Sequence, residues 1–229
     1  MDKIKLIFFD MDGVLVDVAD YNENGRKVAI STWNTVFEQA GIYHEHERLK
    51  EMFIKGSFSS YMEWTDEACR VLQKHGLTRD KFMEIINSRL LMNGAKETLR
   101  ELKKRGYKTA VITGCFKTLA ERTQKLLSLD YIIAHCELAF DDNGNLKEWR
   151  LIPCDFEGKV EYFNKQAKEL NLKPSECAYI GDDVNDIPIF RKAGLSIAFN
   201  CQKEEVKKAA HIVIDKKDLR EILQYFPSF

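Results

Sequence analysis

The segment 4–9 constrains the fold most, because a largely apolar run that stops abruptly at Asp10 is typical of a strand buried on both faces. After residue 94, short apolar runs alternate with amphipathic stretches. We expect helices over 95–105, 117–127, 160–170, 186–192 and 219–225, and strands over 109–113, 131–134, 178–180, 195–199 and 212–214. Strands that alternate with helices favour a parallel sheet covered on both faces.

A different pattern fills the region between the first strand and residue 94. The stretch 18–93 is charged and amphipathic, with helices predicted over 67–75, which Gly76 ends, and over 79–91. No strand pattern interrupts it, so we interpret it as a helical insertion. The predicted fold class is α/β: a Rossmann-like parallel sheet core (1–16 and 94–229) with an inserted small helical cap domain (17–93). The turn at 142–144 also predicts a hairpin over 136–151.

Composition narrows the classes of function. The 229 residues include 35 basic and 36 acidic side chains, and no charged tract stands out, which argues against nucleic acid or a membrane as partner. The N-terminal apolar run is too short for a signal peptide or a membrane span. Six scattered cysteines without a C-x-x-C pair indicate reduced thiols. We therefore expect a cytoplasmic protein, monomer or dimer, that acts on a small molecule.

Polar residues follow three of the predicted strands. Asp10 and Asp12 follow the first, Thr113 and Gly114 follow 109–113, and the acidic segment 181–186 follows 178–180. Because the carboxyl ends of parallel strands bind ligands in open sheets, these residues are expected to gather at one edge.

The pair Asp10 and Asp12 suits phosphoryl chemistry. One carboxylate can attack phosphorus and a second, two residues on, can protonate the leaving oxygen, while Met11 points back to the core. The alternative is an ordinary turn after a strand, since Asp and Gly13 are common turn residues.

The segment 181–186 places Asp182, Asp183 and Asp186 within five positions. Such hard oxygen ligands suit Mg²⁺, although the same residues could simply cap a helix N-terminus. Thr113 could hold a phosphoryl oxygen or be a routine N-cap. Lys159, at a predicted helix start, could neutralise phosphate or be solvated surface.

Taken in order, these four segments resemble the motifs of the haloacid dehalogenase-like superfamily. Its two spaced aspartates match Asp10 and Asp12, its Ser or Thr matches Thr113, its lone lysine matches Lys159, and its glycine followed by acids matches the segment 181–186. The resemblance covers the whole chain, and the insertion stands where this superfamily places a cap.

The chain looks most like the phosphoserine phosphatase branch of that superfamily, on the segments 93–99, 105–108, 136–138 and 181–199. The resemblance implies roles for nine residues. These are a nucleophile (Asp10), an acid/base that also offers magnesium a backbone oxygen (Asp12), a metal ligand (Asp182), phosphoryl-holding residues (Thr113, Lys159), substrate or phosphate contacts (Gly114, Asn185) and residues that tune the metal shell and the lysine (Asp183, Asp186). The metal ligands implied are Asp10, Asp12 and Asp182.

Three departures concern the substrate. The branch carries a glutamate nine positions after the nucleophile, where this chain has Ala19, with Asp17 and Asp20 nearby. It has a cap arginine where the stretch 61–68 has none, and its paired glycines are here Gly114 and Cys115. We predict a Mg²⁺-dependent phosphatase for a small phosphorylated metabolite, acting through an aspartyl-phosphate, with phosphoserine a poor substrate.

Two alternatives remain open: a phosphomutase or phosphotransferase, and a non-catalytic phosphate- or protein-binding module on the same fold. Four cap side chains either line the site or pack the cap: Phe58, Tyr61, Met62 and Trp64.

Overall fold

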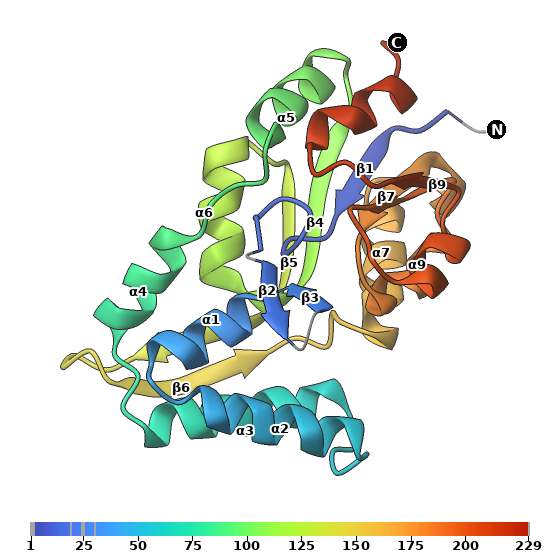
Figure 1. Cartoon of the computed structure of the whole chain (residues 1–229). Helices are drawn as coiled ribbons and strands as arrows, with labels where there is room; N and C mark the ends of the chain where they lie inside the picture. Colours follow the sequence, from blue (N-terminus) through green and yellow to red (C-terminus); the bar gives the residue numbers. More distant parts are fainter. Residues whose placement is uncertain (1–2, 19, 24–25, 30, 229) are drawn as a thin grey trace.

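A seven-stranded sheet forms the centre of the computed structural model, which describes residues 3–18, 20–23, 26–29 and 31–228 (Figure 1). Its strand order is β6-β5-β4-β1-β7-β8-β9, and only β6 runs antiparallel to its neighbour among these strands. The strands are β1 (Leu6–Phe9), β4 (Lys108–Phe116), β5 (Tyr131–Phe140), β6 (Leu146–Leu151), β7 (Cys177–Gly181), β8 (Leu195–Phe199) and β9 (Ile212–Ile214). The predicted parallel α/β sheet is confirmed.

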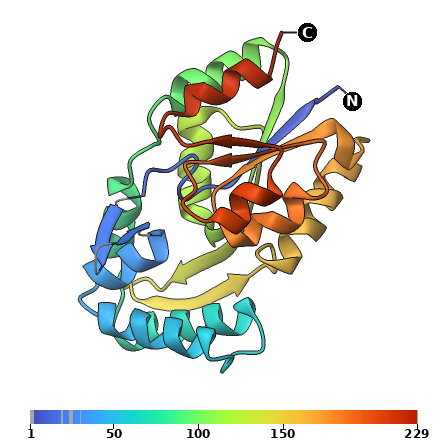
Figure 2. The same ribbon diagram turned by 45° about the vertical axis from the view of Figure 1, so that its right-hand side comes forward.

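Helices cover both faces of this sheet, as the turned view in Figure 2 shows. Alternate residues of β1 point to opposite faces: Ile7 and Phe9 pack into one hydrophobic cluster, and Leu6 and Phe8 into the other. The first cluster is covered by α5 (Ala95–Lys104), α6 (Lys117–Leu127) and the 3₁₀ helix η3 (Leu219–Tyr225). The second is covered by α7 (Glu157–Glu169), α8 (Ile187–Phe190) and α9 (Glu204–Ala209). The short 3₁₀ helices η1 (Pro174–Glu176) and η2 (Val184–Asp186) flank β7.

The inserted region is helical, but it also holds a hairpin that the sequence pattern did not indicate. Its helices are α1 (Thr32–Gln39), α2 (Tyr43–Ile54), α3 (Tyr61–Lys74) and α4 (Arg79–Ser88), and the antiparallel strands β2 (Asp20–Glu23) and β3 (Arg26–Ala29) precede them. The expectation of no strand in 18–93 was therefore wrong. The hairpin is rich in charged and polar residues, so it lacks the apolar alternation by which strands are recognised.

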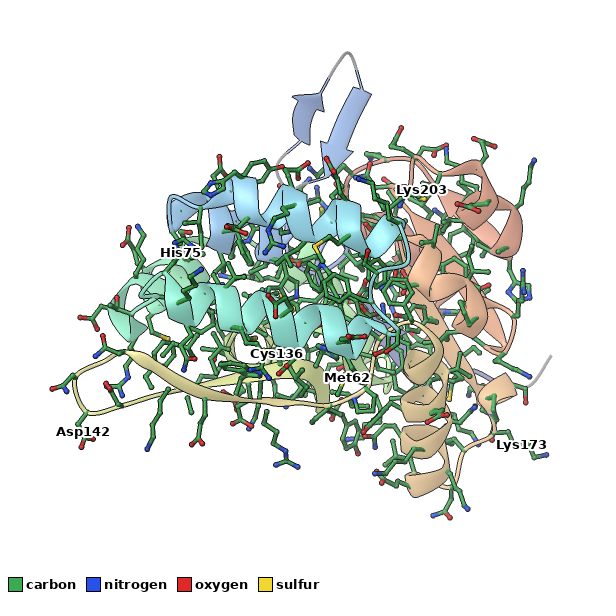
Figure 3. All side chains as sticks on the ribbon, turned by 90° about the horizontal axis from the view of Figure 1, so that it is seen from below. Met62, His75, Cys136, Asp142, Lys173 and Lys203 are labelled. Atoms are coloured by element: carbon green, nitrogen blue, oxygen red, sulfur yellow. The ribbon has the colours of Figure 1, made fainter. Side chains whose placement is uncertain are left out.

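The β5–β6 hairpin forms one edge of the sheet, and its far end projects from that edge to pack against the cap helix α3. Figure 3 shows Asp142 at its tip, and α3 lies along it between Met62 and His75. Trp149 of β6 donates a hydrogen bond to Asp66 of α3 at 2.8 Å. The hydrophobic cluster that contains Ile7 and Phe9 of β1 also includes side chains of the cap helices, so core and cap share one apolar interior on this face of the sheet.

The two crossings between core and cap run side by side. The Asp17 amide donates to the Leu90 carbonyl at 2.8 Å, and the Met92 amide donates to the Leu15 carbonyl at 2.9 Å. The division into 1–16 with 94–229 and 17–93 stays a prediction, which these adjacent crossings favour. Among the described residues, no helix combines the length and apolar character needed to cross a membrane.

Candidate active site

Asp10 and Lys159 form the centre of the site. Asp10 follows the last residue of β1 and is 7% exposed, and Lys159 lies in the first turn of α7 with no exposed surface. The Lys159 Nζ atom is 3.2 Å from Asp10 Oδ2. Burial raises the pKa of Asp10 well above its usual value, against the attraction of Lys159. Burial alone would lower the pKa of Lys159, but Asp10 and Asp186 outweigh it and raise that pKa well above its usual value.

Asp186 is a fully buried carboxylate that several donors hold in place. Its Oδ1 accepts from Lys159 at 2.6 Å and from the Tyr179 hydroxyl at 2.8 Å. Its Oδ2 accepts from the amides of Asp182 at 2.9 Å and Asp183 at 3.2 Å. Asp186 thus fixes both the lysine and the turn after β7. This is not the side-chain cap of 187–189 that the sequence suggested, because its oxygens face back toward β7.

Asp182 follows β7 and adjoins Asp10. Oxygen atoms of Asp10, Asp182 and Asp186 all lie within 4.8 Å of one another. Burial raises the pKa of Asp182 well above its usual value, and the charge of Asp10 adds to this rise. Two adjacent buried carboxyl groups are difficult to ionise at the same time. A hard divalent cation bound to their oxygens would compensate both negative charges.

Asp12 is held by the first residue of the cap helix α1. Its Oδ2 accepts from the Thr32 amide at 2.9 Å, and its Oδ1 accepts from the Thr32 hydroxyl at 2.7 Å. Gly13, which directly follows Asp12, has a φ of +85°. Met11 is fully buried in the core cluster, as expected for the residue that alternates with the two aspartates. The cap therefore positions the second aspartate of the motif.

Thr113 and Gly114 lie where the regular pairing of β4 with β5 breaks. β4 continues to Phe116, so α6 begins at Lys117 and its free amides do not follow Thr113 directly, contrary to the expected strand end. Thr113 Oγ1 accepts from the Cys115 amide at 3.1 Å. The Gly114 carbonyl accepts from Trp33 Nε1 at 3.1 Å and from the Tyr61 hydroxyl at 3.2 Å.

Three glycines make room for three carboxylates. A Cβ atom would lie 2.1 Å from Asp182 Oδ2 at Gly13, 1.9 Å from Asp155 Oδ2 at Gly114, and 2.2 Å from Asp186 Oδ2 at Gly181. No real Cβ atom approaches an oxygen so closely, so each carboxylate occupies the space of an absent side chain.

A cavity of about 370 Å³ opens onto these residues. It contains seven of the nine predicted site residues: Asp10, Asp12, Thr113, Gly114, Asp182, Asp183 and Asn185. Lys159 and Asp186 lie behind the cavity wall. Lys159 contacts the lining residue Asp10, and Asp186 accepts a hydrogen bond from the amide of the lining residue Asp182. Of the four cap side chains considered, Tyr61 and Trp64 line the cavity, while Phe58 packs against the core cluster and Met62 stands outside the lining.

Sequence reasoning missed several lining residues. The main ones are Ser31, Trp33, His46, Asp155, Phe156 and Lys203. Asp155 stands one helical turn before Lys159, which is the sequence signal that could have identified it. Trp33 and His46 belong to helices that the pattern did not indicate, so no signal was present. Lys203, labelled in Figure 3, comes from the loop after β8 and pairs with Asp183.

Comparisons with known proteins agree with this geometry. The haloacid dehalogenase-like hydrolase family model matches residues 4–194. The chain is 34% identical to a phosphoserine phosphatase of Methanocaldococcus jannaschii, over 97% of this chain and 98% of that one. It is 30% identical to a phosphoserine phosphatase of Wolinella succinogenes, over 97% and 100%.

A solved structure described as a phospho-aspartyl intermediate analogue of phosphoserine phosphatase superimposes with a TM-score of 0.79. It is 32% identical in sequence, and the match covers 99% of this chain and 100% of that one. The chain therefore belongs to the haloacid dehalogenase-like hydrolases, in their phosphoserine phosphatase-like branch, and is a phosphoric monoester hydrolase.

Proposed function

We propose that this chain hydrolyses a small phosphate monoester with Mg²⁺, using Asp10 as the nucleophile. The observation that carries the proposal is the position of the Asp10 carboxylate. It lies at the end of the central strand β1, opens onto the cavity, and has Lys159 Nζ 3.2 Å from one oxygen. A module that only bound phosphate would gain nothing from a buried carboxylate at this point, because it repels the ligand.

In the first step, an Asp10 oxygen attacks phosphorus and an aspartyl-phosphate forms as the ester oxygen leaves. The Asp12 carboxyl group gives its proton to that oxygen and becomes a carboxylate, and Thr32 positions this side chain. In the second step Asp12 accepts a proton from water as the water oxygen attacks phosphorus, and the bond to Asp10 breaks to release inorganic phosphate and the free Asp10 carboxylate. Lys159 offsets charge near the attacking carboxylate throughout. Thr113, Gly114 and Asn185 are the proposed contacts of the phosphoryl group and substrate.

The residues present fit a magnesium ion. Asp10 and Asp182 offer carboxylate oxygens, and Asp12 is the third proposed ligand through its backbone oxygen. Asp183 also lines the cavity, and an oxygen of Asp186 lies within 4.8 Å of those of Asp10 and Asp182. Asp186 accepts hydrogen bonds from Lys159, Tyr179 and the amides of Asp182 and Asp183, so we assign it to Lys159 and the turn rather than to the metal. When bound, Mg²⁺ offsets negative charge on the phosphoryl oxygens.

The deciding test is turnover of a generic aryl phosphate by Asp10→Asn. An amide cannot form the acyl phosphate, so activity should fall by several orders of magnitude, roughly the 10⁶ seen when a serine protease loses its nucleophile. Asp142→Asn, at the exposed tip of the β5–β6 hairpin, is the matched control and should keep wild-type activity.

Beryllium fluoride mimics a phosphorylated aspartate, so with Mg²⁺ it should bind wild type and Asp142→Asn but not Asp10→Asn. Wild-type turnover by a purified Asp10→Asn protein would remove Asp10 as nucleophile and the mechanism with it.

The proposed setting is the cytoplasm. All six cysteines are buried free thiols, and the thiols of Cys69 and Cys136 share a hydrogen bond with their sulfur atoms 3.8 Å apart. Six cysteines without a C-x-x-C pair favour a reducing compartment. A monomer or dimer without nucleic acid or membrane partners stays a prediction.

A further inference from the structure

The cavity is strongly acidic for a site that must accept a phosphate dianion. Its described lining holds five aspartates against a single lysine: Asp10, Asp12, Asp155, Asp182 and Asp183 against Lys203. Lys203 is already paired with Asp183. His46 adds no cation at neutral pH, because burial lowers its pKa. A magnesium ion at Asp10 and Asp182 would compensate that pair, which leaves Asp155 to be explained.

Asp155 is buried deeply for a carboxylate, with 6% of its side chain exposed. Asn185 donates a hydrogen bond to its Oδ1 at 2.7 Å, but Lys159 is 3.9 Å away and closer to two other aspartates. By donating to Asp155, Asn185 leaves its own Oδ1 buried without a partner among the described residues. Within the described part of the chain, Asp155 therefore has no close cation of its own, and a buried carboxylate with a remote, shared cation favours a positively charged ligand.

Aromatic rings complete the wall next to Asp155. Tyr61, Trp64 and Phe156 line the cavity, with the Tyr61 ring 5.3 Å from Trp64 and 5.1 Å from Phe156 between centroids. Both Tyr61 and Asp155 contact Gly114. The Tyr61 hydroxyl donates to the Gly114 carbonyl, and Asp155 Oδ2 lies where a Cβ atom of residue 114 would be. Aromatic faces beside a carboxylate are the surroundings in which ammonium groups bind.

We propose that the leaving alcohol carries an ammonium group and no carboxylate, so that the substrate is the phosphate monoester of an amino alcohol and Asp155 determines this specificity. Asp155 receives the cationic nitrogen, with Tyr61, Trp64 and Phe156 around its substituents. A carboxylate on the leaving alcohol is disfavoured because the one lysine of the described lining is paired. This inference rests on the proposed phosphatase function and specifies its substrate.

Matched substrate pairs separate charge from size. Phosphocholine differs from 3,3-dimethylbutyl phosphate, and phosphoethanolamine from propyl phosphate, by replacing a carbon with a charged nitrogen. Wild type should prefer the charged member of at least one pair by about tenfold or more in kcat/KM. Phosphoserine differs from phosphoethanolamine by its carboxylate, and should be about tenfold poorer.

Asp155→Asn tests the residue, because an asparagine can still accept from Asn185 while losing the charge. The charged-to-neutral ratio should fall toward one in this variant, and Asp142→Asn should keep the wild-type ratio. Because each ratio is taken within one protein, a general loss of activity does not affect it. Calorimetric binding of choline alone should likewise weaken in Asp155→Asn.

The outcomes are distinct. No Mg²⁺-dependent hydrolysis of 4-nitrophenyl phosphate by wild type would refute the proposed function itself. Hydrolysis of that ester with equal rates within both pairs, a best rate with phosphoserine, or an unchanged ratio in Asp155→Asn would overturn the specificity inference while the phosphatase stands.

Discussion

Lys159 is the residue on which the charge balance of the site depends. It has no exposed surface and stands within 3.2 Å of Asp10 and 2.6 Å of Asp186. A lysine is seldom buried unless paired, and here two carboxylates compensate it. The converse also holds, because without the lysine both carboxylates would be buried and uncompensated.

Replacing Lys159 by methionine should therefore lower the free energy of unfolding by about 3 kcal/mol at pH 7.5, since methionine fills the space but leaves two buried carboxylates without a compensating cation. The loss should shrink at pH 5, because the unpaired carboxyl groups are then more readily protonated. Urea unfolding at the two pH values in metal-free buffer measures both effects.

Lys168→Met, on the exposed side of the same helix, is the control and should change the free energy of unfolding by less than about 0.5 kcal/mol. A Lys159→Met protein as stable as this control at pH 7.5 would contradict the charge-balance argument.

At the scale of elements, α3 of the cap and β5 of the core meet through polar contacts inside an apolar interface. His135 of β5 is 1% exposed, and its Nε2 lies 3.0 Å from the Thr65 hydroxyl of α3. Burial lowers the pKa of His135, so the native state holds the neutral imidazole. Protonation of this histidine must therefore oppose the packing of α3 on β5.

The sign of the pH effect follows from linkage. A histidine whose pKa is lower in the folded than in the unfolded chain binds fewer protons when folded, so its contribution to stability is present above about pH 6.5 and is lost as the pH falls below it. Wild type should lose stability more steeply below pH 6.5 than His135→Asn, by at most about 1.4 kcal/mol per pH unit.

Chemical unfolding of both proteins between pH 5 and 7.5 gives these slopes, and the site carboxylates cancel because both chains share them. His44→Asn, on the exposed surface of α2, should keep the wild-type slope. Equal slopes for wild type and His135→Asn would show that His135 does not titrate with unfolding.

Elements differ in how far the sequence predicts them. The core strands and helices were predicted because apolar periodicity marks them, and Asp10 and Asp182 because they follow such strands. The hairpin β2–β3 has no apolar face to signal it, and α1 and α2 were not recognised at all. The spacing of Asp155 four residues before Lys159 is a sequence signal for it, but its contact with Gly114, forty-one residues earlier in the chain, arises only on folding.

At the scale of the whole molecule, a bound metal would join two neighbouring central strands. Asp10 follows β1, Asp182 follows β7, and these strands pair in register. Burial raises the pKa of each carboxyl, neighbouring carboxylates add to the rise, and a bound cation would oppose both effects. Metal binding should consequently stabilise the fold and not just the reaction.

Mg²⁺ at one hundred times its dissociation constant should add about 2.7 kcal/mol to the free energy of unfolding, which raises Tm by roughly 5–10 °C for a chain of this length. Asp182→Asn should lose most of this increment, although relief of repulsion raises its Tm in chelator. Asp142→Asn should retain the increment. Calorimetric melting with and without Mg²⁺ measures it, and a full increment in Asp182→Asn would exclude Asp182 as a ligand.

The three glycines that face carboxylates also determine how this enzyme can tolerate mutation. At Gly13, Gly114 and Gly181 even one methyl group collides with a site aspartate, whereas a Cβ at Gly41, Gly56 or Gly76 would meet nothing within 4 Å. In a saturation library selected for phosphatase activity, the first three positions should accept glycine alone, while asparagine should appear at the other three, where φ is +73° to +75°. The acidic edge is thus encoded as much by hydrogen atoms in place of side chains as by the aspartates themselves, and substitutions that broaden the substrate range must arise elsewhere in the cavity wall.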